Sequence, residues 1–96
     1  MKLILNNDVE LLVLNSTETK NIDEKFWVLT VEAQGNISSE RIDLLVKDNH
    51  LINTMIKDEE NNSKDLSAYE LIGSIKITHG DTLTENIIRI KLKLGE

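Results

Sequence analysis

Hydrophobic and polar residues alternate most clearly near the C-terminal end of the chain. In the segment from Asn86 to Leu94, the apolar residues Ile88, Ile90, Leu92 and Leu94 alternate with the cations Arg89, Lys91 and Lys93. Because successive side chains of a strand point to opposite faces, this period of two indicates a half-buried strand. The segment therefore predicts a strand with a row of three cations on its polar face.

Weaker alternation predicts strands in five further segments, at residues 2–5, 9–14, 26–33, 51–57 and 66–78. Asn6, Asn7 and Asp8 separate the first two, and these residue types favour a reversal of the backbone. Residues 15–24 are polar and indicate a loop. Gly73 interrupts the fifth segment and favours a bulge or a close backbone approach.

One helix is predicted, beginning after Ser38. The Ser38 hydroxyl can cap its first turn, and Ile37 and Ile42 are spaced as a hydrophobic staple. Apolar residues continue at helical spacing until Asn49 or His50, which we expect to end the helix. A helix of about three turns is marginal alone, so it must pack on the sheet.

These elements predict an α+β fold, with a mostly antiparallel β-sheet of about five to six strands and one short helix packed on it. The 96 residues suit one small α+β domain spanning residues 1–96. We expect no membrane span and no signal peptide, because no apolar run has the required length or flanks. Cysteine is absent, which excludes disulfides and thiolate ligands.

The charge of the chain limits its partners. Seventeen Asp and Glu residues against eleven Lys and Arg residues give a net charge of −6. Proteins that bind nucleic acid through its phosphates usually have the opposite sign, so we expect no direct nucleic-acid partner. The acidity is consistent with simple solubility, or with a surface that competes with nucleic acid for a basic groove.

Residues suited to catalysis or metal binding are sparse. His50 and His79 are the two histidines, and we interpret both as structural. Asp58, Glu60 and Asn62 match the first, third and fifth positions of a calcium-binding EF-hand loop, but its required glycine and glutamate are missing. With four glycines, the chain has no glycine-rich phosphate loop. We therefore predict no enzymatic activity, no cofactor and no metal site.

Seven side chains are candidate contacts with a protein partner. The cations of the final strand would face an acidic surface, with Lys76 beside them on a neighbouring strand; the alternative is a solvated face that discourages edge-to-edge pairing. Trp27 shares its parity with Leu29 and Val31 and is expected in the core, which leaves Phe26 as the better exposed anchor. The seven candidates are Arg89, Lys91, Lys93, Phe26, Asp58, Glu59 and Glu60.

Residues 1–7 (MKLILNN), 9–13 (VELLV) and 66–75 (LSAYELIGSI) resemble small uncharacterised proteins of phages and prophages of low-GC Gram-positive bacteria. The order of elements is similar over most of the chain. Leu71 replaces a glycine usual in that family, and the preceding loop is longer and more acidic. The resemblance implies a structural or accessory role near a tail or virion, expression in the host cytoplasm and, as an alternative location, the virion itself.

Two functions are expected. The first is a non-enzymatic interaction protein of a phage tail, baseplate or virion, which binds a protein partner or forms a homo-oligomer through exposed strand edges, the Arg89–Lys93 face or the hairpin Lys2–Leu14. The alternative is an acidic inhibitor of a host defence nuclease, of the anti-CRISPR type, which mimics nucleic acid. It predicts that carboxylates of Asp58–Glu60, Asp65 and Glu70 line up like phosphates.

Overall fold

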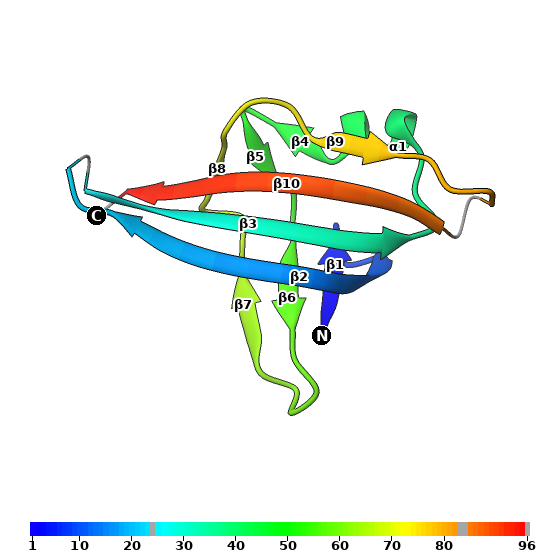
Figure 1. Ribbon diagram of the computed structural model, residues 1–96, viewed down its shortest axis with the longest axis horizontal. Helices are drawn as coiled ribbons and strands as arrows, with labels where there is room; N and C mark the ends of the chain where they lie inside the picture. The colour runs from blue at the N-terminus through cyan, green and yellow to red at the C-terminus, as the bar shows by residue number, and fades with distance from the viewer. Residues whose placement is uncertain (24, 83–84, 96) are drawn as a thin grey trace.

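Three long antiparallel strands form the centre of the protein. The computed structural model describes residues 1–23, 25–82 and 85–95. In it, β2 (Val9–Asn21), β3 (Phe26–Gly35) and β10 (Asn86–Gly95) lie side by side along the longest dimension of the molecule (Figure 1). β3 pairs with β10 over its whole length and with β2 from the Leu12–Gln34 pair onward. The predicted strands at 26–33 and 86–94 are therefore confirmed.

Seven shorter strands extend the described sheet on both sides. The strand order is β4-β5-β8-β10-β3-β2-β1-β6-β7, with β9 paired to β10 beside β8, and every described pair is antiparallel. The short strands are β1 (Lys2–Leu5), β4 (Val46–Lys47), β5 (His50–Leu51), β6 (Met55–Lys57), β7 (Ser63–Asp65), β8 (Glu70–Leu71) and β9 (Lys76–Thr78).

The predicted fold class is wrong. The described residues form a ten-stranded, mostly antiparallel sheet, and α1 (Ser39–Leu44) has only six residues. The α+β prediction of about five to six strands with a packed helix failed for three reasons: two predicted strands each divide into two, part of the predicted helix forms β4, and residues 63–65, outside every predicted strand, form β7. No helix in the described part is long and apolar enough to cross a membrane.

The helix begins as predicted but ends early. Ser38 Oγ accepts a hydrogen bond from the Arg41 backbone N at 3.3 Å. Residues 46–51 then form a hairpin, because Asp48 and Asn49 adopt φ angles of 51° and 65°. Two successive left-handed residues make a tight turn between antiparallel strands. His50 therefore begins a strand and does not end a helix.

Other predicted boundaries also change. The polar segment 15–24 is not a loop: residues 15–21 continue β2, and residue 24 lies outside the described residues. The segment 51–57 divides into β5 and β6, with Asn53 at φ 42° between them. The segment 66–78 divides into β8 and β9. Gly73, at φ 70°, turns the chain between those two strands, and the space around it is open, so no close backbone approach occurs.

The turn between β1 and β2 is confirmed. Leu5 pairs with Val9, and Asp8 N donates to the Leu5 carbonyl oxygen at 3.0 Å. Asn6 and Asn7 have φ angles of 53° and 56°. Asparagine tolerates this conformation better than most residues, so the sequence signal and the geometry agree.

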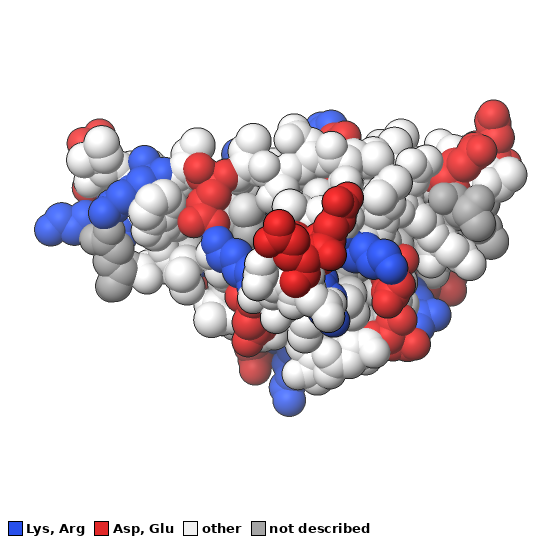
Figure 2. All heavy atoms as spheres, turned by 90° about the horizontal axis from the view of Figure 1, so that it is seen from below, with Lys and Arg blue, Asp and Glu red and all other residues white. Residues whose placement is uncertain are grey.

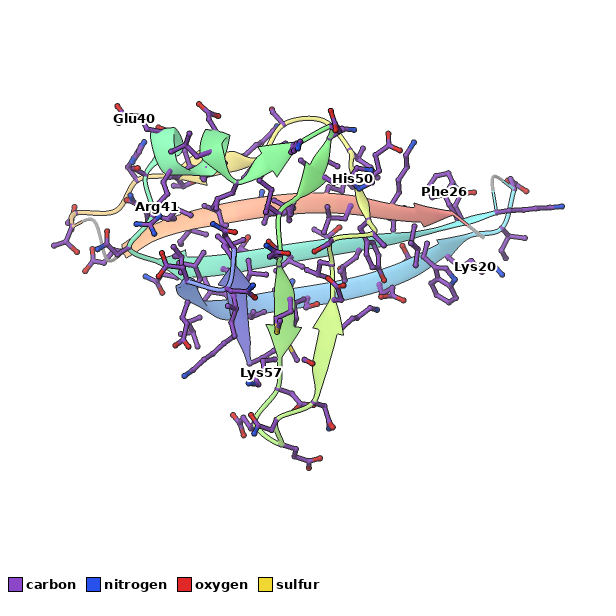
Figure 3. All side chains as sticks on the ribbon, turned by 180° about the vertical axis from the view of Figure 1, so that it is seen from behind. Lys20, Phe26, Glu40, Arg41, His50 and Lys57 are labelled. Carbon is purple, nitrogen blue, oxygen red and sulfur yellow. The ribbon has the colours of Figure 1, made fainter. Side chains whose placement is uncertain are left out.

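The hydrophobic core lies on one face of the long strands, which we call the inner face. β5 and β6 pass across this face, behind the long strands in Figure 1 and in front of them in Figure 3. No described strand or helix crosses the opposite, outer face (Figure 1). The central inner residues are each 2% exposed or less: Leu29, Val31 and Ala33 of β3, and Ile88, Ile90 and Leu92 of β10.

Candidate partner-binding face

The outer face carries the cations of β10. The strand register places Arg89 opposite Glu32 on one side and Lys76 on the other, and Lys91 opposite Thr30. Directly opposite residues of antiparallel strands lie on the same face. The prediction that the β10 cations share a face, with Lys76 beside them, is therefore confirmed, whereas their role in binding stays a prediction.

The cations on this face differ in how they are neutralised. Arg89 donates from Nε and Nη2 to Glu32 Oε2, at 3.1 and 2.6 Å. Lys76 and Lys91 are exposed, and neither ammonium has a hydrogen-bond or ion-pair partner among the described residues. Among the described residues, the face therefore presents two ammonium groups without a partner, of Lys76 and Lys91, beside a guanidinium that Glu32 neutralises.

These side chains line a groove of about 410 Å³, which we call the β10 groove. The connection between β8 and β9 forms one wall, and Ile72 N holds it against β10 by donating to the Lys91 carbonyl oxygen at 2.8 Å. The sheet forms the floor. The lining residues are Thr30, Ile72, Gly73, Ser74, Lys76, Arg89 and Lys91.

A second hollow, of about 490 Å³, lies at the far end of β10. Its lining includes Phe26, His50, Glu70 and Lys93, and Figure 3 shows Phe26 and His50 near this end of the long strands. Lys93 Nζ lies 6.0 Å from the centre of the Phe26 ring, a distance typical of a weak cation–π contact. Phe26 is thus on the outer face, as an anchor requires, but it is half-buried.

Trp27 lies on the inner face, opposite Leu94 of β10. It is half-buried. Lys20 Nζ lies 5.7 Å from its ring centre. The predicted parity of Trp27 is confirmed, but its prediction as a core residue is wrong, because it belongs neither to the buried core nor to the partly buried residues packed against it.

The histidines lie apart from the β10 groove lining. His50 Nδ1 is 2.8 Å from the Tyr69 carbonyl oxygen. Because a carbonyl can only accept, Nδ1 carries the proton, and the bond ties β5 to the segment before β8. His79 is exposed just after β9. In the part of the chain that the structure describes, no three His, Asp or Glu side chains are grouped to hold a metal ion.

The acidic residues at 58–60 form the turn between β6 and β7, which we call the hairpin tip. Asp58 Oδ1 accepts hydrogen bonds from the backbone N of Glu60 and of Asn62, both at 2.9 Å. Glu59 and Glu60 are exposed, and their carboxylates have no partner within the described ranges. Figure 2 looks onto this end and shows acidic atoms toward the viewer with basic atoms on both sides.

The other predicted acidic residues do not join the tip. Asp65 Oδ1 accepts from Ser67 N at 2.9 Å, and hydrogen bonds from the Ser67 backbone and side chain lower the pKa of Asp65 below its usual 3.8. Glu70 lies opposite Lys93 and accepts a hydrogen bond from Asn49 Nδ2 at 3.2 Å. Figures 1 and 3 place β8 and the hairpin tip on opposite sides of the long strands. The structure therefore does not form the predicted acidic array.

An ion pair between Lys64 of β7 and Glu18 of β2 fixes the β6–β7 hairpin beside the long strands. The hydrogen bond to Glu18 raises the pKa of Lys64 above its usual 10.5, and the Tyr69 ring lies 5.6 Å from its Nζ. Lys64 and Glu18 are 46 positions apart in the chain. No sequence pattern connects two such residues, so the pair could be found only from the folded structure.

Sequence reasoning missed two parts of the β10 groove. Glu32 lies on the polar side of a correctly predicted strand, so only its register with Arg89 was unknown. The wall at residues 72–74 was expected inside a strand, and its position depends on the division of that segment. Comparison of the chain with protein-family models, with curated proteins and with solved structures gives no match.

Proposed function

We propose that the chain is a non-enzymatic interaction protein that binds an acidic protein surface through its outer face. The observation that supports this proposal most strongly is that Lys76 and Lys91 have no partner among residues 1–23, 25–82 and 85–95, and lie on a face that no described element covers, in a protein with net charge −6. The lysines flank a groove that an acidic side chain can enter. Complementary charge of this kind steers association and fixes the orientation of the partners.

The aromatic residue at the end of the same face adds an apolar contact. Phe26 is partly exposed and lines the second hollow. Aromatic side chains near charged groups often dominate the energy of an interface. The two hollows along β10 thus offer a partner one cationic contact and one aromatic contact on a single surface.

We further propose that this association occurs in a phage or prophage tail, baseplate or virion. The support is the resemblance of residues 1–7, 9–13 and 66–75 to small phage and prophage proteins. Proteins of such assemblies act through repeated contacts. A small protein with an uncovered sheet face suits a structural or accessory role of this kind.

Inhibition of a host defence nuclease is the second candidate. Glu59 and Glu60 favour it, because their free carboxylates lie at the end of a protruding hairpin (Figure 1). Lys57 and Lys64 belong to the same hairpin, however, and Asp58 is engaged in the turn. Two free carboxylates between lysines are a weak mimic of a phosphate backbone, so we favour the outer face.

Affinity capture from cells in which the prophage is induced tests the proposal. The wild-type chain is compared with the groove variant K76E/K91E, the tip variant E59K/E60K and the control variant K20E/K47E. We expect the wild type and the control to retain a tail or capsid protein at about 0.1 M salt, and the groove variant to lose it. Retention of a host nuclease by every variant except the tip variant would contradict the proposal and support the alternative.

A further inference from the structure

The β10 groove and the hairpin tip of the same protein are complementary. Within the described part of the chain, the groove presents two ammonium groups without a partner, from Lys76 and Lys91, and the tip presents two such carboxylates, from Glu59 and Glu60. We propose that the hairpin tip of one copy docks in the β10 groove of a second copy. This inference rests on the proposed function and identifies the acidic partner as the protein itself.

The β10 groove is suited to receive carboxylates. Arg89 lies next to Lys76 across the sheet and two residues from Lys91 along β10, and its guanidinium pairs with Glu32 on the β3 side. Ser74 and Thr30 add hydroxyl donors to the lining. No atom lies within 4 Å of the position that a Cβ on Gly73 would occupy, so the wall leaves room beside the lysines.

The hairpin tip is rigid before it binds. Asp58 accepts two backbone hydrogen bonds across the turn, and its Oδ2 accepts a third from Asn62 Nδ2 at 3.3 Å. A preorganised loop loses less conformational entropy on binding than a flexible one. Lys64 does not oppose the contact, because Glu18 already neutralises it. Lys57 lies in β6, on the approach to the turn (Figure 3).

The contact must join two molecules. In Figures 1 and 3 the tip points away from the long strands, on the side opposite β9 and the groove wall. A tip and a groove of one copy therefore cannot meet. Because the two contacting surfaces differ, each added copy leaves one free groove and one free tip, and the assembly grows head to tail into a ring or a filament.

Sedimentation velocity of the purified chain tests this inference. At about 0.1 M salt the average mass of the wild type should rise with protein concentration, and at about 1 M salt, where the Debye length falls from about 10 Å to about 3 Å, it should return to that of a monomer. The groove variant K76E/K91E and the tip variant E59K/E60K should each remain monomeric. An equimolar mixture of the two should associate again, because each tip then meets a groove of opposite charge.

The control variant K20E/K47E changes the net charge as much as the groove variant does, away from both the β10 groove and the hairpin tip, and should associate like the wild type. Circular dichroism confirms that each variant is folded. A wild type that stays monomeric, or a variant mixture that stays monomeric, overturns the inference. The proposed function would survive that result if the groove variant still failed to capture a tail or capsid protein that the wild type retains.

Discussion

The two faces of β2, β3 and β10 are made from alternate residues of the same strands, yet they differ in almost every property. On the inner face, Val31 and Leu92 are fully buried in the core. On the outer face, Thr30 and Lys91 border an open groove. Burial of apolar area is the main source of stability in small proteins, so most of the folding energy comes from one face.

This separation of the faces has a consequence for function. Residues of the outer face contribute little to the core, so their identity is free to serve another purpose. Two lysines without partners in the described structure, beside an ion pair, are a stable arrangement on that face only because solvent reaches them. The comparison predicts that substitutions on the inner face change stability, whereas substitutions on the outer face change association.

The largest expected effect comes from neighbouring residues of β10 that point in opposite directions. Ile90→Ala should lower the free energy of unfolding by about 2–5 kcal/mol, since it opens a cavity in the core. Lys91→Ala should change it by less than about 0.5 kcal/mol. Urea denaturation followed by tryptophan fluorescence measures both. Equal losses from the two variants would contradict the separation of the faces.

Two glycines give the next comparison. A Cβ on Gly35 would lie 2.4 Å from Cδ2 of Leu11, which is 1% exposed, whereas a Cβ on Gly95 would meet nothing within 4 Å. Gly35→Ala should therefore destabilise the protein by about 1–3 kcal/mol through overpacking. Gly95→Ala, on the outer face, is the matched control and should be nearly neutral. A neutral Gly35→Ala would mean that Leu11 moves aside without cost.

The ion pair on the outer face should contribute much less. Arg89 is 65% exposed and Glu32 is 28% exposed, so water screens their attraction. We expect Glu32→Gln to cost about 0.2–1 kcal/mol, because exposed pairs contribute little. Thermal unfolding at low and high salt checks this value. A larger loss that persists at high salt would show that the outer face takes part in stability after all.

The smallest expected effect comes from Asp65, the last residue of β7, which belongs to neither face of the long strands. Because the pKa of Asp65 is lowered in the folded state, its contribution to stability is present above pH 3.8 and is lost as the pH falls through the folded pKa. Asp65→Asn should remove this part of the acid sensitivity. Ser67→Ala should reduce it less, since the backbone hydrogen bond, the larger cause, remains. Unfolding curves between about pH 2 and pH 6 test both variants, and an unchanged slope in Asp65→Asn would exclude the effect.

The contrast between long and short strands shows what the sequence can predict. β10 was recognisable because, from Ile88 to Leu94, apolar side chains of the inner face alternate with charged side chains of the outer face. The distal half of β2 was not, since Thr17 and Thr19 are held there by pairing with β3 and not by an apolar face. The division of two segments depends on tight turns at Asn53 and Gly73, whose φ angles sequence patterns indicate only weakly.

The candidate site was predictable to a similar extent. The row of cations follows from the alternation in β10. That the cations lie on the face opposite the core follows from their odd positions alone. The groove required two facts that parity does not contain: the register that places Glu32 beside Arg89, and the chain reversal that places residues 72–74 along Lys91. The sequence shows three consecutive acidic residues at the hairpin tip, but it does not show that Asp58 fixes the turn by accepting backbone hydrogen bonds.

Lysine reactivity tests the central claim, that the outer face is the binding surface, most directly. The chain is treated with an amine-acetylating reagent in dilute and in concentrated solution at about 0.1 M salt, and the modified lysines are quantified by mass spectrometry. The account predicts that Lys76 and Lys91 become protected in the concentrated sample, while Lys20 and Lys47 react equally in both. Unchanged reactivity of Lys76 and Lys91, or protection of Lys20 and Lys47 in their place, would contradict it.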